Sequence, residues 1–96
     1  MVWRITFLPQ VKQDLRELGT TETRAVRKVI EKRMINGEPD KAGKLLSGEP
    51  SGCRRIRTGQ SRIVYRVKHE VIEVVIIAIG LRRNDEVYEK AAERIN

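Results

Sequence analysis

Apolar and polar residues alternate at the amino end of the chain, over residues 2–8. Trp3, Ile5 and Phe7 point to one side of an extended backbone, and Arg4 and Thr6 point to the other. A period of two residues is typical of a strand with one buried face. The pattern therefore predicts a half-buried strand at residues 2–8.

The pattern then changes to a helical period. Pro9 suits the first turn of a helix, where its missing N–H has no intrahelical partner. Val11, Leu15 and Leu18 recur at helical spacing, and Gly19 can end the helix as a left-handed cap. These positions predict a short helix directly after the first strand.

A second helix is predicted to begin at Thr20 or Thr21, since threonine is a good amino-terminal cap. Its core-facing positions form one apolar stripe of Val26, Val29, Ile30 and Met34. Asn36 and Gly37 end the pattern. The two helices together predict an antiparallel helical hairpin with a tight connection.

The pattern of apolar and polar residues changes again after a loop at residues 38–52. Leu45 and Leu46 of this loop are expected to contact the core. Residues 53–58, 61–68 and 71–79 have the composition of strands, and the gaps between them are short enough for hairpins. The simplest topology is an antiparallel meander. The last of these strands is apolar on both faces, which predicts a central position in the sheet.

A final helix is predicted at residues 85–95, where Asp85 can cap it and Val87, Ala91 and Ile95 repeat at intervals of four. The predicted order is β-α-α-β-β-β-α. This order, in a chain of 96 residues, indicates one α+β domain over residues 1–96, with an antiparallel sheet packed against the helical hairpin and the closing helix.

The charge balance indicates an anionic partner. Lysine and arginine number 20 against 13 acidic residues, a formal net charge of +7. Nucleic acid, an anionic membrane and an acidic protein would each satisfy that charge. The longest apolar run, residues 74–79, is far shorter than the roughly 20 residues needed to cross a bilayer. The amino end lacks the layout of a signal peptide. We therefore expect a cytoplasmic protein with no membrane partner.

Metal and thiol chemistry are not expected. Cys53 is the single cysteine and His69 the single histidine, so neither an internal disulfide nor a zinc site can be built from such residues. A lone cysteine in a strand more often packs in the core than acts as a nucleophile. His69 falls in a predicted hairpin turn. The sequence thus predicts no cofactor and no metal.

Arginines gather on one face of the predicted sheet. Strand geometry sends alternate side chains to opposite faces, which places four guanidinium groups together: Arg55, Arg57, Arg62 and Arg66. Like charges on neighbouring strands cost stability, and an anionic ligand would offset that cost. The alternative is a solvated strand face in an arginine-rich protein. The binding face is the favoured interpretation.

Further candidate residues follow the last strand. Arg82 and Arg83 come shortly after Gly80, and Tyr88 lies one turn into the closing helix. Arginine binds phosphate well, stays charged at any biological pH and can stabilise a phosphorane-like transition state. Tyr88 could transfer a proton near these cations, or it could be a core residue at helical spacing from Ala92. The residues alone leave both roles open.

These segments resemble the RelE toxins, the ribosome-dependent mRNA interferases of microbial toxin–antitoxin pairs. The resemblance covers almost the whole chain and is densest in its second half. It is carried by the runs Cys-Arg-Arg-Ile-Arg at 53–57, Arg-Ile-Val-Tyr-Arg-Val at 62–67, Ile-Gly-Leu-Arg-Arg at 79–83 and Glu-Val-Tyr-Glu-Lys-Ala-Ala-Glu-Arg-Ile at 86–95, with Lys-Leu-Leu-Ser-Gly at 44–48.

The resemblance implies a microbial-ribonuclease-type fold that cleaves the mRNA codon in the ribosomal A site. It implies attack by the substrate's own 2′-hydroxyl, a cyclic phosphate product and no metal. Carried over to this chain, Tyr88 would be the general base, Arg62 and Arg82 would hold the phosphate, and Arg55 would favour the phenolate. Well-known members have lysine at the positions of Arg55 and Arg57. The second lysine is their proton donor, and arginine is a much weaker acid.

The resemblance also implies partners. Further RNA contacts are expected from four basic residues: Lys44, Arg54, Arg66 and Arg83. The expected partners are a RelB-like cognate antitoxin, the ribosome with mRNA in its A site, 16S ribosomal RNA, and operator DNA through the antitoxin alone. Two alternatives remain at this point. One is a ParE-like poison of DNA gyrase with the same fold, and the other is a non-catalytic module that binds RNA or the ribosome.

Overall fold

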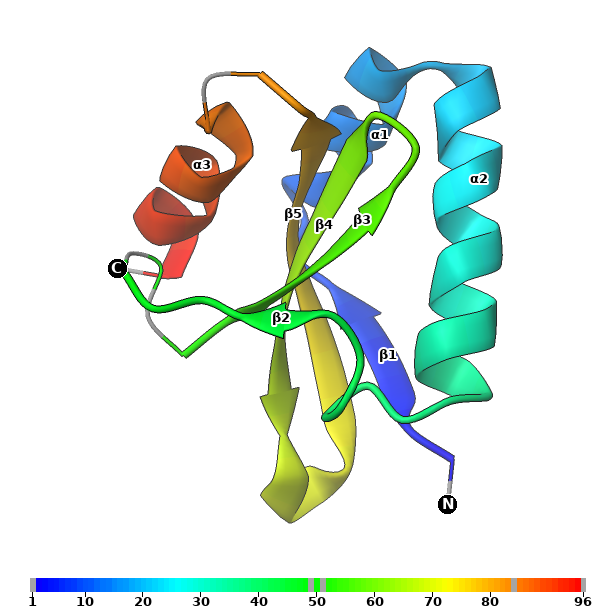
Figure 1. Cartoon of the computed structure of the whole chain (residues 1–96), viewed down its shortest axis with the longest axis vertical. Helices are drawn as coiled ribbons and strands as arrows, with labels where there is room; N and C mark the ends of the chain where they lie inside the picture. The colour runs from blue at the N-terminus through cyan, green and yellow to red at the C-terminus, as the bar shows by residue number, and fades with distance from the viewer. Residues whose placement is uncertain (1, 49, 51, 84, 96) are drawn as a thin grey trace.

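The computed structural model describes residues 2–48, 50, 52–83 and 85–95. Along the chain, the elements are β1 (Arg4–Phe7), α1 (Val11–Leu18), α2 (Thr20–Ile30), a π-helical turn η1 (Glu31–Ile35), β2 (Lys44–Leu45), β3 (Arg54–Thr58), β4 (Ser61–Lys68), a 3-10 turn η2 (His69–Val71), β5 (Glu73–Leu81) and α3 (Glu86–Ile95). Figure 1 shows their arrangement. The predicted α+β class is confirmed, with the very short strand β2 added inside the segment predicted as loop.

The sheet of the described residues has five strands in the order β1-β5-β4-β3-β2. Strands β3, β4 and β5 form the predicted antiparallel meander. Strand β1 pairs in parallel with β5, so the sheet is mixed and the prediction of a wholly antiparallel sheet is wrong at this edge. Strand β5 lies between β1 and β4. The interior position predicted for this apolar strand is confirmed.

The start of β5 differs from the prediction. Val71 belongs to the turn η2 and Ile72 has a φ of 51°, which is left-handed backbone that cannot continue a strand. Strand β5 therefore begins at Glu73 and continues beyond Ile79 to Leu81. The connection from β4 is longer than the two-residue turn expected, because residues 69–72 all belong to it.

A β-bulge divides β5 between the two faces of the sheet. Val64 of β4 lies opposite Ala78 and Tyr65 lies opposite Ile76, so Ile77 has no partner of its own across the ladder. An extra residue of this kind shifts the alternation of side chains. Ile77 and Ala78 consequently both pack on the α3 side of the sheet. The sequence showed only a continuous apolar run here.

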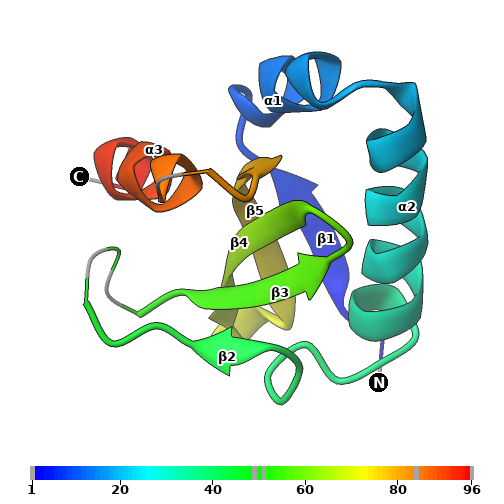
Figure 2. The same ribbon diagram turned by 45° about the horizontal axis from the view of Figure 1, so that its top comes forward.

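Helices cover both faces of the sheet, with α1 and α2 on one side and α3 on the other (Figure 2). The larger core lies under α1 and α2 and contains Trp3, Val11, Val26, Ile30, Met34, Ala42, Ile56, Ile63, Tyr65, Val74, Ile76 and Ile79. The smaller core lies under α3 and contains Cys53, Val64, Ile77, Ala78, Val87 and Ala91. Burial of each large aliphatic side chain stabilises the fold by roughly 1.5–3 kcal/mol. Cys53 is fully buried here, as its packing role predicts.

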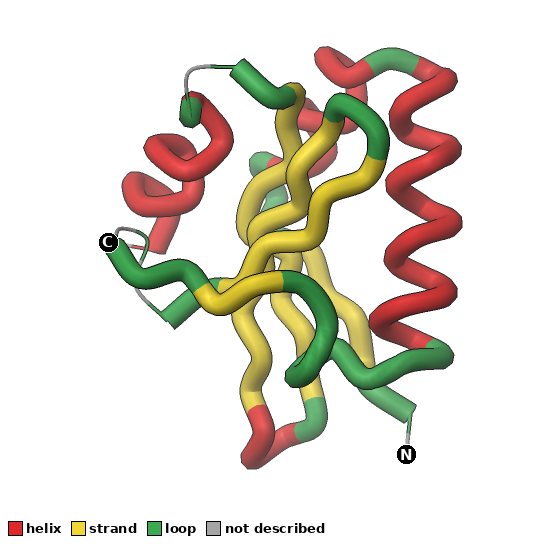
Figure 3. The backbone as a smooth tube through the Cα atoms, viewed as in Figure 1, coloured by secondary structure: helices red, strands yellow, loops and turns green. Residues whose placement is uncertain are grey.

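The two ends of the sheet differ. The turn η2 lies at one end, and the connection from β5 to α3 lies at the other (Figure 3). His69 is therefore remote from the residues that follow β5, and its ring packs edge-on against Trp3 with the centroids 5.8 Å apart. Within the described ranges, every helix is too short or too polar to span a bilayer.

Candidate active site

A hollow of about 360 Å³ opens where β3, β4 and the end of β5 meet α3. Its lining consists of Arg55, Arg57, Arg62, Leu81, Arg82, Arg83, Asp85, Val87 and Tyr88. All five residues expected to act in catalysis belong to this lining. Five arginines face a single carboxylate, so the hollow is strongly electropositive. It can bind an anion such as a phosphodiester.

Strand register brings two of these arginines together. Arg57 lies directly opposite Arg62 in the antiparallel pairing of β3 with β4. Arg62 is only 7% exposed, and its Nη1 donates to the Ser61 carbonyl at 3.4 Å. A directly opposed pair of like charges destabilises a sheet. This cost is offset when an anion binds between the guanidinium groups, which favours the binding-face interpretation over a solvated strand face.

Tyr88 lines the hollow from the first turn of α3. Its hydroxyl oxygen accepts a hydrogen bond from Nη1 of Arg55 at 3.4 Å. The Nε of Arg55 is buried and has no hydrogen-bond acceptor among the described residues. A buried donor without an acceptor is uncommon in native proteins and often marks a functional site. Lys44 of β2 lies opposite Arg55 in the register, so it adds a further cation beside the pair.

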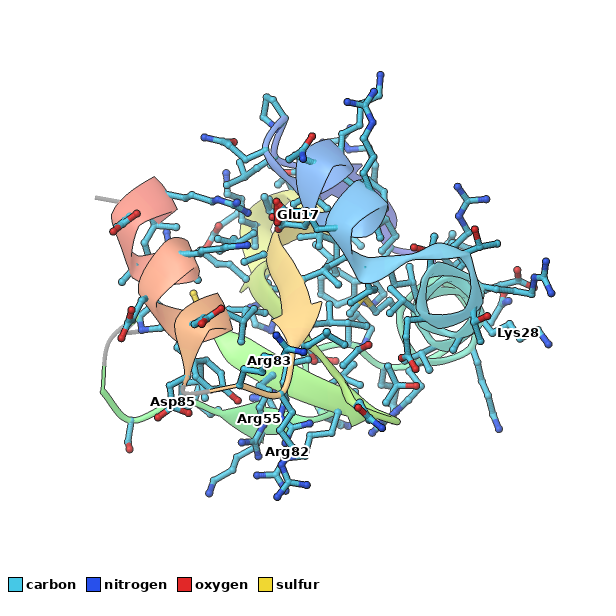
Figure 4. All side chains as sticks on the ribbon, turned by 90° about the horizontal axis from the view of Figure 1, so that it is seen from above. Glu17, Lys28, Arg55, Arg82, Arg83 and Asp85 are labelled. Carbon is cyan, nitrogen blue, oxygen red and sulfur yellow. The ribbon has the colours of Figure 1, made fainter. Side chains whose placement is uncertain are left out.

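The connection from β5 to α3 carries the remaining cations. Arg82 and Arg83 are exposed, and the backbone N–H of Arg82 donates to the Gln60 carbonyl at 2.7 Å, which links this segment to the β3–β4 turn. Figure 4 shows Arg55, Arg82 and Arg83 close together at one side of the molecule. Asp85 has a φ of 58°, which turns the chain sharply into α3. The segment thus holds its arginines against the strand arginines.

Helix α3, which carries Tyr88, is fixed to the sheet by a buried ion pair. Arg94 binds the Asp14 carboxylate through two hydrogen bonds of 2.7 and 2.9 Å, and the Ile79 N–H donates to the same carboxylate at 3.0 Å. Burial tends to raise the pKa of Asp14, but the hydrogen bonds from Arg94 and Ile79 outweigh it and lower the pKa below its ordinary value. Asp14 and Arg94 were not predicted as part of the site. The available signal was a carboxylate beside the apolar stripe of α1.

Gly80 is a second anchoring feature that was not predicted. A Cβ at this position would approach the Val87 Cβ to 3.3 Å, so the glycine allows α3 to pack directly on β5. Val87 is buried in that contact and is followed by Tyr88. Close packing here therefore sets how far the phenol lies from the sheet arginines.

Three of the four expected RNA contacts do not line the hollow: Lys44, Arg54 and Arg66. Arg54 points to the other face of β3, where its Nε donates to the Ala42 carbonyl at 2.9 Å. The hydroxyl of Tyr65 lies 2.9 Å from both the Pro39 and the Ala42 carbonyl oxygens, and its single O–H can donate to either. Burial raises the pKa of Tyr65, and its predicted place in the core is confirmed. Arg54 is thus used to hold the loop that precedes β2.

Arg66 also stands apart from the hollow. It pairs with Val75, four residues along β4 from Arg62, and does not contribute to the lining. The predicted cluster on the sheet therefore contains Arg55, Arg57 and Arg62, and Arg66 extends that face beyond the hollow. In the part of the chain that the structure describes, no group of three or more histidine, cysteine, aspartate or glutamate residues is placed to hold a metal ion.

Solved structures with this architecture define the class of protein. The toxin–antitoxin complex RelBE2 of Mycobacterium tuberculosis matches with a TM-score of 0.77 and 28% identity, covering 85% of this chain and 93% of that chain. A doubly substituted Escherichia coli toxin RelE in the free state matches with a TM-score of 0.79 and 28% identity over 100% of both chains. The fold is that of a type II toxin.

Sequence comparisons agree. The family model for the ParE toxin of the type II toxin–antitoxin system parDE matches residues 5–86. The mRNA interferase toxin RelE of Escherichia coli strain K12 is 31% identical over 99 residues, which cover 99% of each chain. The chain belongs to the RelE/ParE superfamily of type II toxins.

Proposed function

We propose that this toxin is an mRNA interferase, an endoribonuclease that cleaves mRNA in the ribosomal A site and so inhibits translation. The observation that supports this proposal is the convergence of Tyr88 with four arginines, Arg55, Arg57, Arg62 and Arg82, in one hollow. The relative that matches over nearly the full chain is named an mRNA interferase. A hollow with this charge suits a phosphodiester, and the phenol adds a group for proton transfer.

The proposed reaction is an internal transesterification. The 2′-oxygen of the nucleotide attacks its own 3′-phosphorus, and the bond from phosphorus to the 5′-oxygen of the next nucleotide breaks. The products are a 2′,3′-cyclic phosphate and a 5′-hydroxyl. Tyr88 accepts the proton of the 2′-hydroxyl, and Arg55 fixes the phenolic oxygen by its hydrogen bond of 3.4 Å. Arg62 and Arg82 bind the phosphate and stabilise the charge of the transition state. No metal takes part in this scheme.

Arg57 is assigned to the leaving 5′-oxygen. It lies opposite Arg62 and therefore beside the phosphate that Arg62 would hold. Arginine stays protonated, so it is poorly suited to donate the proton that the departing oxygen needs. We assign it the electrostatic stabilisation of the leaving alkoxide, with water as the source of the proton.

The proposed partners follow from the same chemistry. The ribosome presents the mRNA in its A site, with 16S ribosomal RNA around it, and Lys44 and Arg83 flank the hollow where further phosphates would lie. Some of the solved relatives are complexes of a RelE toxin with a RelB antitoxin. We propose a RelB-like cognate antitoxin for this toxin as well, and contact with operator DNA only through that antitoxin.

Primer extension on a reporter mRNA in a purified translation system tests the proposal. The wild-type toxin is compared with Arg82→Ala, each with and without ribosomes, and Arg4→Ala serves as the control for the loss of an exposed arginine outside the hollow. We expect cleavage within A-site codons that requires both the ribosome and Arg82. Intact mRNA in every reaction, with active ribosomes, would overturn the proposal.

Poisoning of DNA gyrase is the second candidate, because the matching family model is that of the ParE toxin. A gyrase poison would have no use for a tyrosine held among arginines, whereas an interferase would. Expression of the toxin in a sensitive host separates the two. Arrest of amino-acid incorporation before that of thymidine supports the interferase, and the reverse order supports the gyrase poison.

A further inference from the structure

A second basic groove lies on the other side of the molecule, between α1 and α2. It has a volume of about 540 Å³, and its lining consists of Lys12, Leu15, Arg16, Gly19, Thr20, Thr23, Arg24 and Arg27. Four cations and two threonine hydroxyls line it, and no carboxylate does. It shares no residue with the hollow that contains Tyr88. It is therefore a separate electropositive site.

The local structure explains why this groove is a fixed feature of the fold. Gly19 has a φ of 93°, which allows α2 to begin one residue after α1 ends. The Gly19 N–H donates to the Leu15 carbonyl at 3.3 Å, and the Thr23 hydroxyl donates to the same carbonyl at 3.0 Å. The two helices are thus held together at their junction, and the cations on them keep a constant relation to one another.

The cations of the groove are not neutralised by the residues that the structure describes. Lys12, Arg16, Arg24 and Arg27 form no ion pair among the described residues, whereas Arg4, Lys41, Lys68, Lys90 and Arg94 each have an acidic partner. The basic surface continues along α2 through Lys28. Figure 4 shows Lys28 projecting from α2 on a different side of the molecule from Arg55 and Arg82. Such unpaired charge repels itself, and a polyanion would relieve the repulsion.

We propose that the groove between α1 and α2 binds the phosphodiester backbone of folded RNA and holds the toxin on the ribosome, while the hollow at Tyr88 carries out cleavage. This inference rests on the proposed interferase function, because that function supplies a large folded RNA as the partner. Contacts from lysine and arginine to phosphates position a protein on nucleic acid and supply much of its affinity.

The lining of the groove favours RNA over the other anionic partners. A membrane-surface helix needs large exposed apolar residues beside its cations, and the groove offers only the half-buried Leu15. An antitoxin segment would also need apolar anchor pockets to bind tightly. A phosphate backbone requires only cations and hydroxyl or N–H donors, which are the groups present.

The test compares two pairs of substitutions that each remove two positive charges. The groove pair is Arg16→Gln with Arg27→Gln. The control pair is Arg4→Gln with Lys41→Gln, whose exposed side chains lie outside the groove and each form an ion pair with one glutamate. Both pairs are placed on an Arg82→Ala background so that the mRNA stays intact. Thermal unfolding followed by circular dichroism verifies that every variant is folded.

The measurement is the affinity for purified, mRNA-programmed ribosomes as a function of salt concentration. Loss of two phosphate contacts should reduce the slope of log affinity against log salt by about two. We expect this change, with a Kd at least tenfold weaker in about 0.15 M salt, for the groove pair only. Equal changes in both pairs would overturn the proposal, because they would show an effect of net charge alone.

Two further measurements separate this inference from its alternatives. A toxin that carries the groove pair and an intact Arg82 should cleave mRNA at the wild-type rate when ribosomes saturate the toxin. A much lower rate would place the groove in the catalytic site. Weakened binding of the antitoxin, with unchanged binding to ribosomes, would assign the groove to the antitoxin. The ribosome titration does not depend on cleavage, so it can support or overturn the proposal that the groove binds RNA even if no mRNA is cut.

Discussion

The guanidinium of Arg94 in α3 holds the carboxylate of Asp14 in α1 through two hydrogen bonds, and it also donates to the Ile77 carbonyl of β5 at 2.9 Å. One side chain therefore joins both helices to the strand that leads into the candidate active site. The Asp14 side chain is only 1% exposed and that of Arg94 is 13% exposed. Since Tyr88 belongs to the same helix as Arg94, this ion pair fixes the phenol relative to the arginines of the sheet.

Replacement of Asp14 should destabilise the protein. Asp14→Ala leaves the Arg94 guanidinium nearly buried without its partner, and breaking a buried pair in this way costs about 3–5 kcal/mol. Urea unfolding measures the free energy of unfolding. Glu17→Ala is the matched control, because Glu17 forms only an exposed ion pair with Lys90 at 3.6 Å and should cost under about 1 kcal/mol. Equal losses in both variants would show that the Asp14 pair has no special role.

The same carboxylate should make stability depend on acid pH. The pKa of Asp14 is lower in the folded protein than its ordinary value of 3.8. The unfolded state therefore binds the proton more readily. The contribution of the ionised Asp14 carboxylate to stability is complete above pH 3.8 and is lost as the pH falls through the folded-state pKa. The free energy of unfolding, measured by urea titration from pH 6 down to pH 3, should fall more steeply for the wild type than for Asp14→Asn. Parallel curves would contradict this assignment.

Removal of the phenolic hydroxyl at the hollow should abolish most of the activity. Tyr88→Phe keeps the ring but removes the group that accepts the proton, and a loss of about 10²- to 10⁴-fold in the single-turnover rate is expected. Tyr65→Phe is the control, since it removes a hydroxyl that hydrogen-bonds to the Pro39 and Ala42 carbonyls far from the hollow. That variant should lose stability rather than rate. If Tyr88→Phe cleaves normally, Tyr88 is a packing residue.

The sequence predicted those features that depend on local periodicity. Alternation placed Arg55 and Arg57 on one face of β3, and the register with β4 places Arg57 opposite Arg62. That Arg82 and Tyr88 belong to the same site as these arginines was predicted from the family resemblance. Sequence periodicity does not show which residues of a loop or a helix lie near a given strand. The hollow contains both of them.

Features that depend on long-range contacts were not predicted. Strand β2 has only two residues, too few to show a pattern, and it forms because Lys44 and Leu45 pair with β3. The partner of Arg54 is a backbone carbonyl in a loop, which no side-chain pattern indicates. The bulge at Ile77 could not be predicted either, because an apolar residue suits both faces of a strand that is covered on each side.

Packing at Gly80 should couple stability to activity. In Gly80→Ala the new methyl group would lie 3.3 Å from the Val87 Cβ, so Val87 must shift by a few tenths of an ångström, and we expect Tyr88, the next residue, to shift with it. Such overpacking costs about 1–3 kcal/mol, and the displacement of Tyr88 should lower the cleavage rate roughly tenfold or more. Gly48→Ala is the control for stability, because no heavy atom lies within 4 Å of its added Cβ. A fully active Gly80→Ala variant would show that the phenol tolerates movement of the helix.

Replacement of Arg57 by lysine tests the step in which the 5′-oxygen leaves. The side chain at this position lies opposite Arg62, within the hollow. An arginine there can stabilise the alkoxide but is a poor proton donor, whereas a lysine ammonium crowded by neighbouring guanidinium groups gives up its proton more readily. Arg57→Lys should therefore raise the single-turnover rate on programmed ribosomes roughly tenfold, and Arg57→Gln should lower it.

The same two substitutions at Arg66, which lies outside the hollow, should leave the rate unchanged. If Arg57→Lys is slower than the wild type, the fork geometry of the guanidinium matters more than proton donation, and Arg57 would be assigned to binding the phosphate.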